Sequence, residues 1–111
     1  MNYSISLSLI ASASLFFILS GSSVAKDEDG AALYKAKICQ TCHGDDANTP
    51  TMKTYPKLAG QSEEYLLQQM KDFKSGARTN SQAALMKAML ASVTEDDMKV
   101  LSAYIASLPA K

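Results

Sequence analysis

Two cysteines and a histidine near the middle of the chain have a spacing that suits one kind of chemistry. Cys39, Cys42 and His43 occupy positions i, i+3 and i+4, which share one face of a helical turn. Each thiol in such an array can add across a vinyl group of a haem, and the neighbouring imidazole can reach the iron from the same side. The spacing C-x-x-C-H is typical of c-type haem attachment. The motif therefore predicts one covalently attached haem c, with His43 as an iron ligand.

Three other uses of these cysteines fit the sequence less well. A redox dithiol should lie beside a βαβ pattern, and the chain has no strand-rich stretch of that kind. A zinc site needs three or four protein ligands, whereas these are the only two cysteines and His43 is the only histidine. A disulfide between Cys39 and Cys42 would close a very small loop and constrain little of the unfolded chain.

The first residues of the chain predict export. Residues 1–25 carry no charged side chain and are rich in Ile, Leu, Phe, Ala and Ser, and a charged run begins at Lys26. Small residues at the end of this segment predict cleavage by a signal peptidase after Ala25, which would leave residues 26–111 as one mature domain in the periplasm. The alternative is an uncleaved N-terminal segment that tethers the protein to a membrane. Against stable insertion, the apolar stretch is shorter than the roughly 20 residues that span a bilayer.

Composition narrows the classes of partner. Acidic and basic side chains balance at eleven each, and no basic cluster with interleaved aromatic residues occurs, so nucleic acid is not an expected partner. A mature domain this small has a marginal apolar core and often needs a staple. A covalently held haem would be that staple, and its two propionates would make the holoprotein mildly acidic.

Periodicity predicts an all-α domain of about four helices around the haem. A helix entered from acidic residues runs from residue 30 to residue 38 and leads into the haem motif. Turn residues and two prolines make 44–60 a loop. The remaining helices are expected from the cap at Ser62 to Gly76, over 83–90, and from the cap at Thr94 to Leu108.

The lone histidine leaves the second axial position of the iron to a methionine, a lysine or other amine, or nothing. A thioether is attractive because Met/His ligation raises the reduction potential. Met70 and Met98 fall on apolar helical stripes, which is typical of core residues, and Met52 is too close to the haem motif to reach the opposite haem face. Met86 and Met89 remain, and their spacing alone does not separate them.

Several stretches of the chain match a known pattern. They are CQTCHG at 39–44, YPKLAGQ at 55–61, YLLQQMKDF at 65–73, GARTN at 76–80, MKAML at 86–90, and TEDD at 94–97 leading to YIASL at 104–108. Together they resemble a class I c-type cytochrome, and most of all one half of the bacterial two-domain dihaem cytochromes and their single-haem relatives. In that family the first methionine of M-x-x-M binds the iron, which implies Met86, with Met89 as the alternative.

The resemblance implies further site residues. Pro50 matches the loop proline whose carbonyl accepts the ring N–H of the ligand histidine, a bond that would fix the tautomer. Lys57, Gln61 and Arg78 could contact the haem propionates. Gly30 and Tyr104 would lie where the first and last helices cross.

The expected function is that of an exported, monomeric single-haem electron carrier. Its iron would cycle between Fe(III) and Fe(II) and exchange electrons with donor and acceptor proteins through an exposed haem edge, without being an enzyme. One alternative is a haem c electron-transfer subunit of a larger periplasmic oxidoreductase. Another is a gas sensor or haem enzyme with an open axial position, which requires that neither Met86 nor Met89 binds iron.

Overall fold

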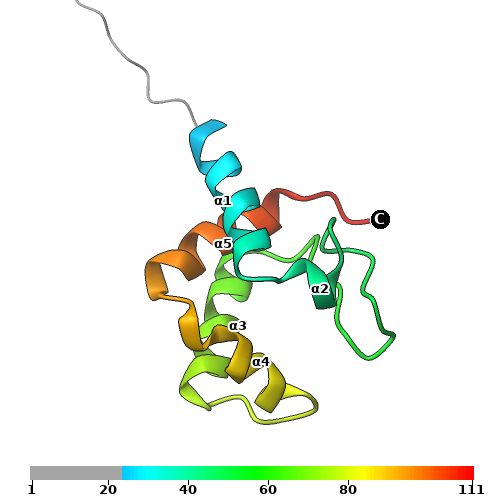
Figure 1. Ribbon diagram of the computed structural model, residues 1–111, viewed down its shortest axis with the longest axis vertical. Helices are drawn as coiled ribbons and strands as arrows, with labels where there is room; N and C mark the ends of the chain where they lie inside the picture. The colour runs from blue at the N-terminus through cyan, green and yellow to red at the C-terminus, as the bar shows by residue number, and fades with distance from the viewer. Residues whose placement is uncertain (1–23) are drawn as a thin grey trace, which may run out of the picture.

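The computed structural model describes residues 24–111, and all regular secondary structure in this range is helical (Figure 1). The elements are α1 (Val24–Ala36), α2 (Gln40–His43), α3 (Glu63–Ser75), α4 (Ala83–Met89), the 3₁₀ helix η1 (Leu90–Ser92) and α5 (Glu95–Ser107). The predicted all-α class is confirmed, with the haem motif itself forming an additional short helix. The expected signal segment, residues 1–25, lies almost wholly outside the described residues. No helix between residues 24 and 111 combines the length and hydropathy needed to cross a membrane.

Capping residues set both ends of α3 and the start of α5, as predicted, whereas α1 begins at Val24 and ends at Ala36 instead of spanning the predicted residues 30–38. The side chain of Ser62 accepts a hydrogen bond from the backbone N–H of Tyr65 at 3.2 Å and starts α3. Gly76, in the left-handed region at φ 83°, ends it. Thr94 starts α5 with a capping box. The short helix predicted over 83–90 differs, because α4 tightens into η1 and the helical path continues to Ser92.

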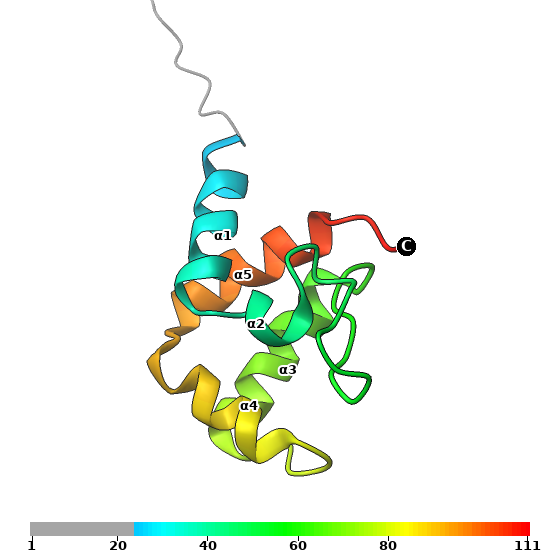
Figure 2. The same ribbon diagram turned by 45° about the vertical axis from the view of Figure 1, so that its right-hand side comes forward.

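The first and last long helices cross at a small residue (Figures 1 and 2). A Cβ atom placed on Gly30 would lie 2.3 Å from the Cβ of Tyr104, so only glycine allows this approach between α1 and α5. One turn later the rings of Tyr34 and Tyr104 meet with centroids 5.8 Å apart. The predicted crossing is confirmed.

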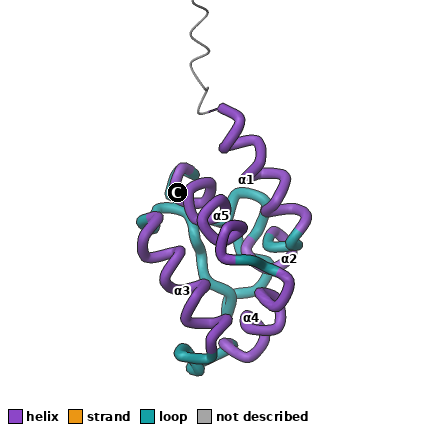
Figure 3. Tube along the Cα trace, turned by 90° about the vertical axis from the view of Figure 1, so that its left-hand side faces the viewer, coloured by secondary structure: helices purple, strands orange, loops and turns teal. Residues whose placement is uncertain are grey.

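The core lies where α3 packs against α5. Leu66 and Met70 of α3 are buried, as are Met98, Leu101 and Ile105 of α5. The core positions predicted for Met70 and Met98 are therefore confirmed. The tube in Figure 3 shows α2 above α4 on the same side of the molecule.

Candidate functional site

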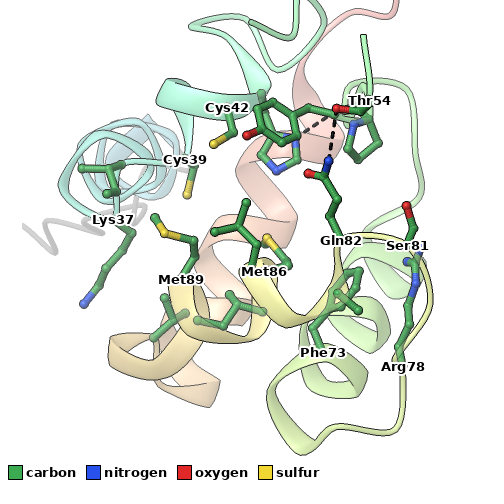
Figure 4. Close-up of a pocket in the computed structure, with 18 of the residues that line it drawn as sticks. Lys37, Cys39, Cys42, Thr54, Phe73, Arg78, Ser81, Gln82, Met86 and Met89 are labelled. Atoms are coloured by element: carbon green, nitrogen blue, oxygen red, sulfur yellow. Dashed lines mark hydrogen bonds between the residues drawn. The ribbon is translucent and has the colours of Figure 1, made fainter. Parts of the chain in front are cut away.

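A pocket between α2 and α4 brings together residues from distant parts of the sequence (Figure 4). The pocket is open to solvent, and about 910 Å³ of space lies within it when the open mouth is counted. Its lining includes Cys39, Cys42 and His43 together with Met86 and Met89. In Figure 4 the sulfurs of Met86 and Met89 extend from α4 toward the side that carries the two cysteines.

The walls of this pocket are largely apolar. Leu90 and Val93 are buried at its inner side, and Ile38 and Leu85 stand half exposed at 49% and 46%. Pockets for organic cofactors are mostly apolar, with a few polar groups that fix orientation. The lining therefore suits a flat apolar group held by sulfur and nitrogen donors, and the residues present fit a haem.

The end of α1 aims the first cysteine into the pocket. Ile38 adopts the left-handed conformation at φ 54°, while the N–H of Cys39 donates to the carbonyl of Tyr34 at 3.0 Å. This pair of features ends the helix and redirects the chain. An L-residue with a branched Cβ in this region costs roughly 1–2 kcal/mol, and such strain is often found at functional sites. The N–H of His43 then donates to the carbonyl of Cys39 at 3.0 Å, which puts the motif on one helical turn as expected.

His43 is held as a neutral ring with one nitrogen free. Its Nδ1 lies 2.8 Å from the carbonyl oxygen of Pro56, and a carbonyl can only accept, so Nδ1 carries the proton and Nε2 keeps its lone pair. The ring is 7% exposed, and burial lowers the pKa of His43 despite the opposing effect of that hydrogen bond. A neutral imidazole with a free Nε2 is the form that binds a metal.

The prediction that the carbonyl of Pro50 accepts a hydrogen bond from His43 is wrong. The loop after α2 first returns to α2 and reaches the His43 ring only further along the chain. The carboxylate of Asp46 accepts hydrogen bonds from the two backbone N–H groups of residues 48 and 49, which closes a tight turn. The N–H of Thr51 then donates to the carbonyl of Cys42 at 3.1 Å, so Pro50 lies in the segment that returns to α2. The chain reaches the ring later, at Pro56.

Both cysteine sulfurs are available for covalent attachment. Cys39 and Cys42 are free thiols and partly buried. Burial raises the pKa of Cys39 to about 11, so this thiol is protonated at neutral pH.

Polar residues gather at another part of the pocket lining. They are Thr54, Tyr55, Arg78, Asn80, Ser81 and Gln82. Arg78 reaches the pocket as predicted, with its guanidinium 4.4 Å from the centroid of the Phe73 ring and one N–H donating to Gln69 at 2.6 Å. Lys57 and Gln61 are exposed and do not line the pocket. The other polar residues were not predicted as site residues, because they lie outside the helices, where no periodicity marks them.

The two candidate methionines are both partly buried, and only their packing separates them. Met86 contacts the buried core, whereas Met89 is not among the residues packed against it. The structure thus brings both thioethers to the pocket, and Met86 is the more firmly packed of the two.

Known proteins share this sequence and fold. The family model for cytochrome c matches residues 28–109. Cytochrome c4 of Pseudomonas aeruginosa is 40% identical over 99 residues, which cover 89% of this chain and 47% of that protein. The thiosulfate dehydrogenase electron acceptor of Stutzerimonas stutzeri is 36% identical over 81 residues, covering 73% of this chain and 36% of that protein.

A solved structure agrees with these matches. The crystal structure of reduced recombinant cytochrome c4 from Pseudomonas stutzeri resembles this chain with a TM-score of 0.67 and 28% identity, covering 78% of this chain and 50% of the other. The chain spans about half the length of the curated cytochrome c4 relatives it matches. It belongs to the cytochrome c family, whose members are electron-transfer proteins that bind haem c covalently.

Proposed function

We propose that the chain is an exported single-haem electron carrier, with haem c attached at Cys39 and Cys42 and its iron held by His43 and Met86. The observation that carries this proposal is the meeting of the motif histidine and two methionine thioethers in one pocket. Met89 is the alternative sixth ligand.

The haem contributes a one-electron redox couple, and the chain's own residues define how it is used. The Pro56 carbonyl fixes the tautomer and the direction of the His43 ring. The thioether of Met86, if it held the iron together with His43, would stabilise the ferrous state and raise the reduction potential. If His43 and Met86 both held the iron, no coordination site would remain for a substrate, which would favour a carrier over an enzyme or a gas sensor.

The polar part of the pocket lining is proposed to receive the haem propionates. Arg78 is the cation in that part of the lining, and Asn80 and Gln82 add hydrogen-bonding groups. Lys57 and Gln61 remain predictions for this role, and would need to swing toward the mouth to fulfil it.

Export to the periplasm through residues 1–25 is proposed from the sequence pattern, with an uncleaved membrane tether as the alternative. The donor and acceptor would meet the monomer at the pocket mouth, where Ile38 and Leu85 are half exposed. Small, weak interfaces suit rapid electron exchange. The relative named as a thiosulfate dehydrogenase electron acceptor supports a dehydrogenase as one class of donor, and leaves a stable oxidoreductase subunit as the second candidate function.

Substituting each candidate ligand in turn tests the redox centre. We expect holoprotein with Met86→Ala to lose the methionine–iron charge-transfer band of the ferric state and to show a lower reduction potential. Met89→Ala, three residues along the same wall, is the matched control and should keep the band. The reverse pattern would assign the iron to Met89. A high-spin wild-type protein that binds carbon monoxide readily would contradict a closed centre.

A further inference from the structure

Met86 and Met89 lie on α4, which continues into η1, and the two carbonyls at its end accept hydrogen bonds from lysine side chains and not from backbone N–H groups. Among residues 24–111 no backbone N–H donates to the carbonyl of Ser92 or of Val93. The Nζ of Lys37 donates to Ser92 O at 2.8 Å, and the Nζ of Lys74 donates to Val93 O. Carbonyls at the end of a helix need such partners, and a charged donor forms a stronger bond than a neutral one.

These lysines reach the same point from different elements. Lys37 directly follows α1 and lies two residues before Cys39, while Lys74 is in the last turn of α3. Lys37 also lies 3.8 Å from the carboxylate of Asp97 at the start of α5, and both side chains are mostly covered, with 23% and 27% exposed. The two lysines, called the lysine clasp below, therefore connect the end of η1 to three long helices.

The opposite end of the methionine segment is held more weakly. There the side chain of Gln82 donates to the hydroxyl of Thr54 at 3.2 Å, an exposed bond between neutral groups. Between the two ends, buried Leu90 and Val93 supply packing but no polar anchor. The lysine clasp thus supplies the charged hydrogen bonds that hold α4 and η1, called the methionine-bearing wall below, to the rest of the molecule.

We propose that Lys37 and Lys74 are positioning residues that hold the methionine-bearing wall closed over the haem. This inference rests on the proposed methionine ligation. Without the clasp the wall opens more often, the thioether leaves the iron for a larger fraction of the time, and an added ligand binds in its place. An added ligand that binds only the open state reports the open fraction directly through its apparent affinity.

Imidazole titration of the ferric holoprotein tests the clasp. Imidazole is largely uncharged above about pH 8, where the titration is run, so loss of a lysine charge does not itself alter its attraction to the site. We expect Lys37→Leu and Lys74→Leu each to raise the apparent imidazole affinity by about threefold or more, and the double variant by about tenfold or more. The matched control is Lys71→Leu, because Lys71 lies on the same helix as Lys74 but pairs with the exposed Glu95 at 3.1 Å. It should stay within about twofold of wild type.

A conservative variant separates positioning from general destabilisation. Lys37→Arg keeps a cationic donor and should return the imidazole affinity close to that of wild type. Two results would overturn the clasp. One is an imidazole affinity in Lys37→Leu and Lys74→Leu that equals that of wild type, and the other is a rise in affinity in Lys71→Leu as large as in these two variants. If either result is obtained and wild type still shows the methionine–iron band, the proposed methionine ligation stands and only the clasp is rejected. Absence of that band in wild type would overturn both.

Discussion

At the scale of single residues, His43 shows how buried surroundings select one chemical form. Two effects oppose each other at this ring: burial disfavours the charged form, and the hydrogen bond to the Pro56 carbonyl favours it. Burial is the larger, so the pKa falls below its ordinary value and the ring is neutral near pH 7. A metal then meets a lone pair without first displacing a proton.

Tyr34 is the residue whose hydroxyl connects α1 to the end of the haem motif. Its ring is 1% exposed, its hydroxyl donates to the carbonyl of Gly44 at 2.7 Å, and burial raises the pKa of Tyr34 far above its ordinary value. We expect Tyr34→Phe to lower the free energy of unfolding by about 1 kcal/mol, the net value of one buried hydrogen bond. The loss is no larger because the N–H of Ala47 still donates to Gly44 O.

Denaturant unfolding of the holoprotein measures this loss. Tyr65→Phe is the control, since that side chain is 48% exposed on α3 and its hydroxyl can exchange partners with water. Equal stability losses in the two variants would contradict a specific role for the Tyr34 hydroxyl.

At the scale of elements, the capping box of α5 predicts an acid-sensitive part of stability. The carboxylate of Asp97 accepts from the backbone N–H of Thr94 at 3.1 Å, and this bond holds the pKa of Asp97 below its ordinary value. A depressed pKa stabilises the folded state above the unfolded pKa of about 3.9, and the contribution disappears as pH falls through the folded value. We therefore expect Asp97→Asn to be less stable than wild type at pH 7, with the difference shrinking below pH 4.

Asp96→Asn provides the comparison for this prediction. Asp96 has the same charge in the same first turn but takes no part in the capping box. Its substitution removes a negative charge from the same first turn without removing a capping hydrogen bond, and should lower the stability at pH 7 by less than Asp97→Asn does. Parallel curves for Asp97→Asn and wild type, measured by thermal unfolding from pH 7 to pH 3, would show that the box carries no acid sensitivity.

Helix ends could be predicted here because their signals are local. Ser62, Gly76 and Thr94 act on backbone groups within a few residues, so their types and spacing are enough. The partner of His43 could not, because the choice between Pro50 and Pro56 depends on how a loop without periodicity turns back on α2. No local pattern marks such a path.

The lysine clasp was equally invisible in the sequence. Lys37 and Ser92 are 55 residues apart, and Lys74 and Val93 are 19 apart, so neither spacing follows a helical or strand period. From sequence alone, an isolated lysine is expected to be a solvated surface residue. Only the folded structure, in which both side chains reach the end of η1, reveals that these two lysines have backbone partners.

At the scale of the whole molecule, a neutral chain carries its charges unevenly around the pocket. The lining includes Lys37 and Arg78 and no acidic residue. The two segments that flank the pocket, 47–62 and 73–94, contain lysines and arginine but no aspartate or glutamate. With eleven charges of each sign in the sequence, the acidic groups must concentrate elsewhere. The pocket lining therefore carries positive charge, which haem propionates would reduce.

This asymmetry predicts opposite salt dependence for small redox reagents of opposite charge. Reduction of the ferric holoprotein by anionic hexacyanoferrate should slow as ionic strength rises, whereas reduction by cationic hexaammineruthenium should accelerate, because salt screens attraction in one case and repulsion in the other. Lys87→Glu, on α4 beside Met86, should lower the hexacyanoferrate rate at low salt by about two- to fivefold. Lys99→Glu, exposed on α5 outside both flanking segments, makes the same change in net charge and should have a smaller effect. Stopped-flow rates that respond equally to both substitutions would mean that net charge, rather than the field at the pocket mouth, steers the approach of redox partners.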